Sequence, residues 1–181
     1  MTRRGLAFGA LLAAAALGLA CQRRGSEAAA GGPAPSPGRT EKATVSLLFP
    51  GDDGFLHAEP RELVLPLEPD GRVEAVVGAL LAGPKTDGLV APLPAGVTVA
   101  DAFVDGQGVA YLDLGAKDQP DPPASGSDLE LLRVYSLVNT VLANEPRVRG
   151  VVLLWNGTQR PTFAGHVDTG APLLADRRLV R

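Results

Sequence analysis

Two kinds of apolar spacing follow one another along residues 43–181, and their order is the strongest constraint on the fold. Apolar and polar residues alternate at 45–49 and again at 63–67, which predicts two short, half-buried strands. Prolines interrupt the second run, so we expect it at the edge of a sheet. From 73 to 81 the apolar residues recur instead at i, i+3, i+4, i+7 and i+8, the spacing of one helix face. The first half of the domain is therefore predicted to run strand, strand, helix.

Local signals set the ends of this helix and the start of a second one. Asp70 is placed to cap the first helix, and Gly83-Pro84 to end it. Ser127 and Glu130 stand three residues apart, the spacing of a capping box, in which the two side chains bond reciprocally at a helix start. An apolar stripe at helical spacing continues from Ser127, so a second helix is predicted there.

The remaining segments are predicted to be strands and one long loop. The β-rich runs 97–104 and 109–114 flank Asp-Gly-Gln-Gly, the strongest hairpin signal in the chain. A continuous apolar run at 151–155 predicts a central strand, and 163–167 predicts a last short one. Residues 116–126 contain three prolines and little to bury, which predicts an exposed loop. The order β(β)αββαβ(β) predicts an α+β fold, a two-layer sandwich with a mostly antiparallel sheet and two helices on one face.

The N-terminus has the pattern of a lipoprotein signal peptide. A basic start at residues 1–4 precedes an uncharged apolar run of sixteen residues, shorter than the ~20 that a membrane-spanning helix needs. Cys21 follows a small residue, as in a bacterial lipobox, although Gly18 stands where a leucine is usual. We therefore predict that residues 1–20 are removed and that acyl chains such as palmitate, attached to Cys21, anchor the protein to a membrane. The alternative is an ordinary signal peptide with a chance cysteine.

The predicted organisation is a signal peptide (1–20), a lipidated cysteine with a disordered tether (21–42) and one domain (43–181). The tether is rich in Gly, Pro, Ser and Ala and has nothing large to bury. Cys21 is the only cysteine, so no intramolecular disulfide can form. The predicted location is extracytoplasmic and membrane-anchored. Gln22 resembles outer-membrane sorting, which places the protein on the periplasmic face of the outer membrane in a two-membraned cell, and otherwise on the outer face of the plasma membrane.

Charge and composition argue against nucleic acid as a partner. The chain has 17 Lys and Arg against 20 Asp and Glu, and loss of residues 1–20 removes Arg3 and Arg4. Such an acidic chain has no electrostatic footprint for nucleic acid. Aromatic residues are only 4% of the chain, which disfavours a platform for stacking bases or sugars. The predicted membrane contact is the lipidated Cys21.

Five short motifs follow in order along the domain: Leu-Leu-Ala-Gly-Pro at 80–84, Pro-Ala-Gly-Val at 94–97, Val-Ala-Tyr-Leu-Asp-Leu at 109–114, Ser-Leu-Val-Asn-Thr at 136–140 and Ala-Gly-His-Val-Asp at 164–168. Over about residues 43–174 they resemble the GerMN domain family of sporulation and spore-germination lipoproteins. The resemblance implies an αββαβ sandwich similar to the ring-building motif of secretion assemblies, which stacks through protein–protein contacts. It implies no catalytic residue and no cofactor. The sporulation protein carries two such domains in tandem, and this chain has room for one.

The polar residues do not form a recognisable catalytic or metal-binding pattern. His57 and His166 are far apart and lack the HxxxH spacing of zinc sites, so no metal site is predicted. The acids that could join them in space are Asp52, Asp53 and Asp168. A triad of Ser136, His166 and Asp168 is possible on paper, but Ser136 lies within a helix pattern without the GxSxG elbow that exposes a nucleophile.

Six residues of the motifs and the central strand are candidates for a structural or an interface role: Gly83, Pro84, Asn139, Trp155, His166 and Asp168. Asn139 faces away from the apolar stripe and is expected to bond a loop carbonyl, or else to contact a partner. Trp155 is expected in the core, or else at a rim where partners dock. His166 is expected to bond the backbone and, with Asp168, to hold the C-terminal strand in place.

Three functions of different classes remain open. The leading one is a non-catalytic, lipid-anchored scaffold of the cell envelope. It would bind an envelope protein, or a second copy of itself, through the edge strand at 63–67 or the helix at 127–144. The alternative is a module that binds peptidoglycan or a small envelope ligand between helices and sheet. The third, a hydrolase of the cell wall, requires an essential polar side chain in a cleft.

Overall fold

A computed structural model describes residues 38–181 of the chain. The predicted signal peptide, Cys21 and the predicted tether as far as residue 37 lie outside the described residues. Between residues 38 and 181, no helix combines the length and the apolar character needed to cross a membrane. The first strand begins at Thr40, just before the domain boundary predicted at residue 43.

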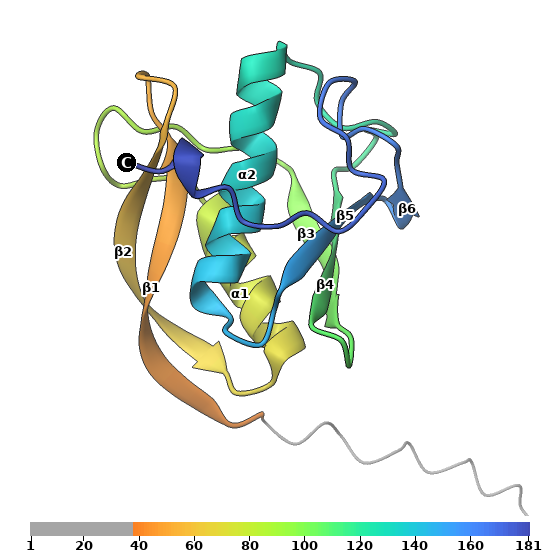
Figure 1. Cartoon of the computed structure of the whole chain (residues 1–181). Coiled ribbons are helices and arrows are strands. Elements are labelled where there is room, and N and C mark those ends of the chain that lie inside the picture. The colour runs from red at the N-terminus through yellow and green to blue at the C-terminus, as the bar shows by residue number, and fades with distance from the viewer. Residues whose placement is uncertain (1–37) are drawn as a thin grey trace, which may run out of the picture. The chain divides into compact units, whose positions relative to one another are not determined.

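The predicted α+β class and the order of elements are confirmed (Figure 1). The elements are β1 (Thr40–Pro50), β2 (Leu56–Pro66), α1 (Pro69–Leu81), β3 (Thr98–Val104), β4 (Val109–Gly115), α2 (Ser127–Asn144), β5 (Gly150–Trp155), β6 (Thr158–Gln159) and the 3₁₀ turn η1 (Arg177–Leu179). The strands form two sheets where one was expected, β1-β2 and β3-β4-β5-β6. Pairing is antiparallel except between β4 and β5, which α2 connects as a crossover helix.

The hairpin of β1 and β2 is longer than the alternation of apolar residues predicted. Its register runs from Thr40 opposite Pro66 to Pro50 opposite Leu56. The first residues of β1 are exposed, whereas Val45, Leu47 and Phe49 are buried. Alternation of apolar residues marks only the part of a strand that covers a core. It therefore missed the exposed part of this hairpin, which is held as a strand only by its backbone pairing.

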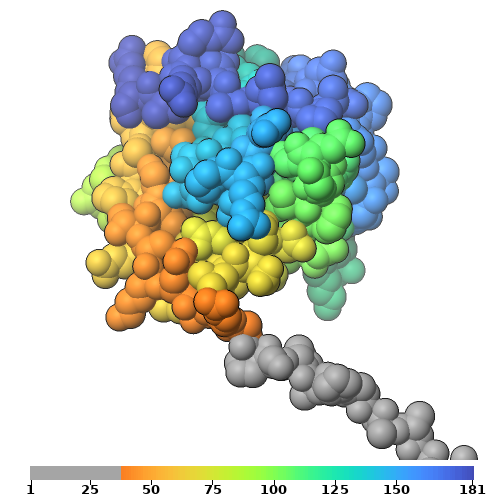
Figure 2. All heavy atoms as spheres, turned by 60° about the horizontal axis from the view of Figure 1, so that its bottom comes forward, coloured from red at the N-terminus to blue at the C-terminus, as the bar shows by residue number. Residues whose placement is uncertain are grey.

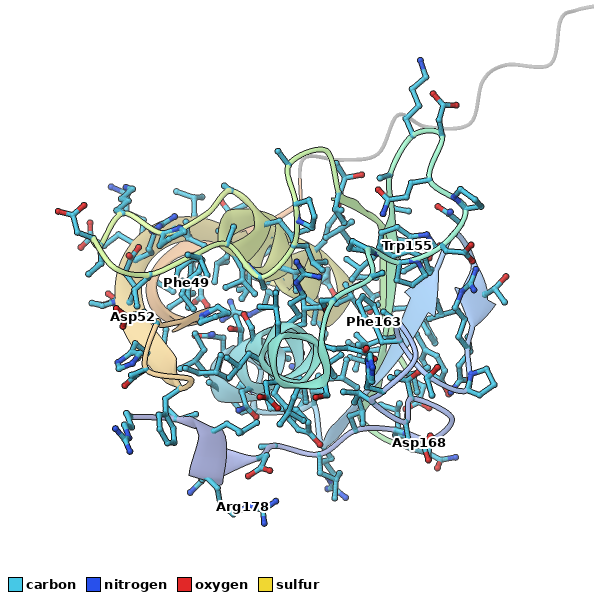
Figure 3. All side chains as sticks on the ribbon, turned by 90° about the horizontal axis from the view of Figure 1, so that it is seen from above. Phe49, Asp52, Trp155, Phe163, Asp168 and Arg178 are labelled. Atoms are coloured by element: carbon cyan, nitrogen blue, oxygen red, sulfur yellow. The ribbon has the colours of Figure 1, made fainter. Side chains whose placement is uncertain are left out.

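Both helices contact both sheets. α1 packs on β3 and β2, while α2 packs on β1 and β5. Seen along its axis in Figure 3, α2 stands between the β1-β2 hairpin and the larger sheet. This differs from the predicted sandwich, in which two helices cover one face of a single sheet. The reason is that the first two strands form a sheet of their own.

One continuous apolar core fills the space between helices and sheets. Its fully buried members include Leu47, Val77, Leu112, Leu137 and Trp155. The ring of Trp155 meets Phe163 edge-on, with centroids 6.2 Å apart. Both residues are labelled in Figure 3 beside β5. The core reading of Trp155 is therefore the one that the structure supports.

The two predicted side-chain caps are wrong, for a common reason. α1 begins at Pro69, whose nitrogen has no hydrogen to cap, and Asp70 instead accepts a hydrogen bond from the backbone N–H of Val104 at 2.8 Å. α2 begins at Ser127 without a side-chain cap, and Glu130 is completely buried. In both cases the local pattern assigned the carboxylate to the helix start, but the carboxylate accepts hydrogen bonds from distant backbone N–H groups instead.

The strand predicted at 163–167 is also wrong. This segment is a tight turn closed by the N–H of Phe163, which donates to the carbonyl of Val167, and by a bridge between Thr162 and Asp168. Gly165 has a φ of +119°, a conformation that breaks a strand. The last strand is the two-residue β6, which immediately precedes this turn.

The loop at 116–126 is irregular, as predicted, and side chains from β5, from α2 and from the residue after β6 hold its carbonyl groups. Trp155 donates its indole N–H to the carbonyl of Gln119 at 3.1 Å. Arg160 and Arg133 donate to the carbonyls of Pro120 and Pro123. The loop is therefore attached to the core side of β5 and to α2.

Candidate interaction site at the sheet edges

Polar side chains of α2 close the outer edge of β1 at Ser46 and Leu48. Ser136, Thr140 and Asn144 lie four residues apart and project from the same helix face. The hydroxyl of Ser136 donates to the carbonyl of Leu48 at 2.6 Å, and the hydroxyl of Thr140 accepts from the N–H of Leu48 at 3.0 Å. Asn144 both accepts from and donates to the backbone of Ser46 at 2.8 Å. These side chains replace a neighbouring strand.

The same register shows which groups of β2 face outward. Ser46 and Leu48 direct their backbone groups away from β2, and they stand opposite Pro60 and Ala58. Because backbone direction alternates along an antiparallel pair, the even-numbered residues of β2 also face outward. Two of them are prolines, Pro60 and Pro66, which have no N–H to leave unpaired.

The outer edge of β2 is open in its central part. At one end, the N–H of Arg181 donates to the carbonyl of Leu56 at 2.9 Å. Between Pro60 and Pro66, the N–H and C=O groups of Glu62 and Val64 have no hydrogen-bond partner among residues 38–181. The side chain of Val64 is 60% exposed. This window, which we call the β2 edge, fits an additional strand.

The free edge of the larger sheet is closed in a different way. Asp70 accepts from the N–H of Val104, and Asp101 accepts from the N–H of Ala102 at 2.9 Å. A register shift between Val99 and Asp101 also bends β3. Carboxylates therefore take two of the N–H groups that another strand would need, and the bulge bends the edge away from a straight partner.

A buried carboxylate holds the turn that contains the Ala-Gly-His-Val-Asp motif. Glu130 accepts from the backbone N–H groups of Ala164 and Val167 at 2.9 Å and from that of His166 at 3.1 Å. The Nδ1 atom of His166 lies 2.7 Å from Glu130, while 47% of the side chain of His166 is exposed. Burial raises the pKa of Glu130, but these hydrogen bonds outweigh it and lower the pKa to about 2.

The structure separates the residues of the possible triad. His166 was expected to bond the backbone, but its ring bonds the carboxylate of Glu130 instead. Ser136 donates to Leu48, and Asp168 accepts from the N–H of Gly170 at 2.9 Å. Each of the three residues therefore has another partner, and the triad is not assembled.

A second buried carboxylate holds the turn after α1, where the Leu-Leu-Ala-Gly-Pro motif lies. Glu59 accepts from the N–H groups of Lys85 and Thr86 at 2.9 Å and from Arg61, which also donates to the carbonyl of Gly83. Burial opposes the charge of Glu59, yet these bonds lower its pKa to about 2. Gly83 has a φ of +89°, and Pro84 follows it directly, so the chain leaves the helix at this motif as predicted.

Asn139 and the histidines also have partners within the domain. Asn139 is buried and exchanges two hydrogen bonds with the backbone of Asp176, at 2.9 and 3.0 Å, which matches the expected bond to a loop carbonyl. His57 bonds the adjacent turn through Asp53 at 2.9 Å. In the part of the chain that the structure describes, no three His, Cys, Asp or Glu side chains gather as metal ligands would.

Sequence reasoning missed two features of this site. The closure of β1 was visible as three polar residues, Ser136, Thr140 and Asn144, at four-residue spacing on a helix that is otherwise apolar around them. The role of Glu130 had no such signal, because its partners are backbone groups more than thirty residues away.

Solved structures share this fold. The tandem GerMN domains of the sporulation protein GerM from Bacillus subtilis match with a TM-score of 0.56 at 19% identity, over 78% of this chain and 48% of that chain. The first GerMN domain of the same protein matches with a TM-score of 0.55 at 19% identity, over 75% and 98%. A candidate lipoprotein from Clostridium perfringens matches with a TM-score of 0.52 at 14% identity, over 76% and 89%. The fold is therefore that of a GerMN domain.

The family follows from the sequence as well. Residues 46–161, more than half of the chain, match the family Germane, whose description is "Sporulation and spore germination". The chain belongs to the Germane family. No curated protein matches the chain in sequence.

Proposed function

We propose that the chain is a lipid-anchored, non-catalytic protein of the cell envelope that binds a protein partner through the β2 edge. The observation that carries this proposal is the contrast between edges. On β1 the outward groups of Ser46 and Leu48 are bonded by side chains of α2, and on β3 two outward N–H groups are bonded by carboxylates. The window at Glu62–Val64 has no such partner among residues 38–181, and it has the exposed apolar side chain of Val64 beside it. The polar residues of the family motifs support it too, because Ser136, Asn139 and His166 are engaged within the domain.

A partner strand would bind this window by backbone hydrogen bonds. The N–H and C=O groups of Glu62 and Val64 supply donors and acceptors in alternation. Val64 offers an apolar contact, and the exposed carboxylate of Glu62 favours a basic side chain opposite it. Acyl chains on Cys21 and the segment that follows it would keep the domain near the membrane surface, where the partner is also expected.

Site-specific photocrosslinking in cells tests the proposal with the full, membrane-anchored chain. A photoreactive side chain at Val64 is expected to capture an envelope protein, and the same group at Ala100, on the closed edge of β3, is not. Glu62→Pro removes the outward N–H and should abolish the adduct. Glu62→Ala keeps the N–H and should retain it. An adduct that survives Glu62→Pro would contradict strand addition, and hydrolysis of peptidoglycan by the purified chain would contradict the non-catalytic role.

A groove between α1 and β3 supports a second candidate function, binding of peptidoglycan or a small envelope ligand. Its volume is about 590 Å³, and Gly71, Ala75 and Gly78 form its floor beside Val97 and Val99. A Cβ atom at Gly78 would meet nothing within 4 Å, so a side chain can be introduced here, and Gly78→Leu is chosen to fill the groove. Co-sedimentation with isolated peptidoglycan tests this second function. Retention of the unsubstituted chain that is lost in Gly78→Leu would support it. If the unsubstituted chain is not retained, peptidoglycan is excluded as the ligand.

A further inference from the structure

The segment 173–181 lies across α2 and the β1-β2 hairpin and leaves a groove beneath it. Three attachments hold the segment: Leu173 exchanges two backbone hydrogen bonds with Val151, Asn139 bonds the backbone of Asp176, and the N–H of Arg181 donates to the carbonyl of Leu56. The guanidinium of Arg181 also stacks 3.6 Å from the ring centroid of Phe55. In Figure 2 this segment runs along one rim of the molecule above the end of α2.

The groove between these attachments is apolar with one charged residue. It has a volume of about 440 Å³. Its apolar lining includes Ala58, Leu142, Ala143 and Val180, and Ser46 and Arg177 are two of its polar members. None of the lining residues that the structure describes carries a carboxylate. The groove therefore presents a single positive charge beside an apolar surface.

Arg177 differs from the other two arginines of this segment. Arg178 pairs with Asp176 at 2.7 Å, and Arg181 lies 3.7 Å from Asp53. Arg177 has no carboxylate partner and no side-chain hydrogen bond within residues 38–181. A guanidinium without a partner at the mouth of an apolar groove is complementary to a carboxylate or phosphate group.

The walls of the groove disfavour a peptide as the occupant. A bound peptide needs partners for its own backbone groups. The outward groups of Ser46 and Leu48 are already bonded to α2, and both ends of the Asn139 amide are bonded to Asp176. An alkyl chain needs no such partners and gains from the apolar walls.

We infer that this groove binds a single-chain amphiphile, with its anionic head group on Arg177 and its alkyl chain between α2 and the hairpin. A volume of about 440 Å³ holds roughly 14 non-hydrogen atoms at ~30 Å³ each, which is the size of dodecanoate. Binding here uses neither the β2 edge nor the groove at Gly78, so it stands or falls separately from the proposed function.

Isothermal titration of the full chain with dodecanoate, below its micellar concentration, tests the inference. Cys21→Ser is included so that no attached acyl chain competes. Saturable one-to-one binding is expected, and Arg177→Gln should weaken it at least tenfold. Arg178→Gln is the matched control and should leave the affinity unchanged. The side chain of Arg178 is 90% exposed, bonds Asp176 and points away from the body of the protein in Figure 3.

Two further arms identify the head group and the groove. Titration with dodecyl phosphate in place of dodecanoate shows which anionic head group binds more tightly. Dodecanol has no charge for Arg177 to pair with, so it should bind weakly, and equally to the unsubstituted chain and to Arg177→Gln. Ala143→Phe, at an exposed position of the lining, should abolish binding, whereas Ala143→Ser should not. Circular dichroism checks that each variant is folded. The inference is overturned if dodecanoate does not saturate, if Arg177→Gln binds it normally, or if both arginine variants weaken it equally.

Discussion

The two strands of the β1-β2 hairpin are paired along their whole length, but their outer edges differ. The edge of β1 is bonded at Ser46 and Leu48 by α2, while the edge of β2 is open at Glu62 and Val64. Both edges belong to one hairpin, so strand composition does not explain the difference. It is explained by what lies beside each strand.

The geometry of helix and strand accounts for the closed edge. Four residues of a helix advance about 6 Å, and two residues of a strand advance about 6.6 Å. Side chains at i, i+4 and i+8 of a helix can therefore meet every second residue of a strand over a short distance. Thr140 and Asn144 do this for Leu48 and Ser46, and Ser136 adds a second bond to Leu48 through its carbonyl. A helix can thus close a sheet edge with three short polar side chains.

The largest effect is expected when the closed edge is deprived of its partners. The double variant Ser136→Ala and Thr140→Val leaves the buried N–H and C=O of Leu48 without hydrogen bonds. Each unsatisfied buried group costs about 1–3 kcal/mol, so the free energy of unfolding in urea should fall by about 4 kcal/mol. A loss below about 1 kcal/mol would mean that α2 does not close this edge.

A somewhat smaller effect is expected from the hydrogen bonds of the Glu59 and Glu130 carboxylates. These bonds depend on pH, whereas the neutral hydrogen bonds to β1 do not. Both carboxyls have a pKa near 2 in the fold, against about 4.5 ordinarily. The folded state binds fewer protons, so their stabilisation is complete above about pH 5 and is lost as the pH falls towards 2. Urea unfolding across this pH range should show a loss in the free energy of unfolding on the order of 3 kcal/mol for each group.

Glu130→Gln is the matched variant for this pH dependence. It should lower the stability at pH 7 by about 3 kcal/mol and flatten the slope between pH 5 and 2. The double variant of Ser136 and Thr140 should keep the slope of the unsubstituted chain, because hydroxyl groups do not titrate there. Equal slopes in all three proteins would contradict the role of Glu130.

Proline substitution compares the two edges directly. Ser46→Pro removes an N–H that donates to Asn144, and should cost about 2 kcal/mol. Glu62→Pro removes an N–H without a partner among residues 38–181, and should cost less than about 1 kcal/mol. Both variants restrict φ in the same way, so thermal unfolding of the pair isolates the hydrogen bond. Equal losses would show that the two edges are equivalent.

The smallest effect is expected at Ser127, which is on the same helix but does not face β1. Its hydroxyl lies 3.4 Å from a carboxylate oxygen of the adjacent Asp128 and caps nothing. Ser127→Ala should therefore change the free energy of unfolding by less than about 0.5 kcal/mol. A loss of about 1 kcal/mol would restore the capping box that the sequence suggested.

The sequence was sufficient for the class of fold and the order of elements, because apolar spacing reports which face of each element is covered. Val73, Val76, Val77 and Leu80 on α1 and most of β5 are buried as their spacing requires. The family resemblance to GerMN domains was also visible in five short motifs. These inferences depend on neighbours in the chain.

The polar contacts of the site could not be predicted, because they depend on neighbours in space. Glu130 has the local pattern of a capping box, yet its oxygens bond the turn at 164–167. Asp70 has the pattern of a helix cap and bonds β3. A carboxylate that can be buried among several backbone N–H groups gains more there than at an exposed helix start, and only the folded chain shows which option is available.

The prolines of β2 have a consequence for how large a complex can become. Pro60 and Pro66 flank the open window at Glu62–Val64, and α2 occupies the opposite side of the hairpin at Ser46 and Leu48. Opposite the window, the outward groups of Lys42 and Thr44 on β1 also have no hydrogen-bond partner among residues 38–181. If the β2 window alone accepts a strand, association stops at one neighbour for each molecule, and if the edge at Lys42 and Thr44 accepts one as well, association can continue from molecule to molecule.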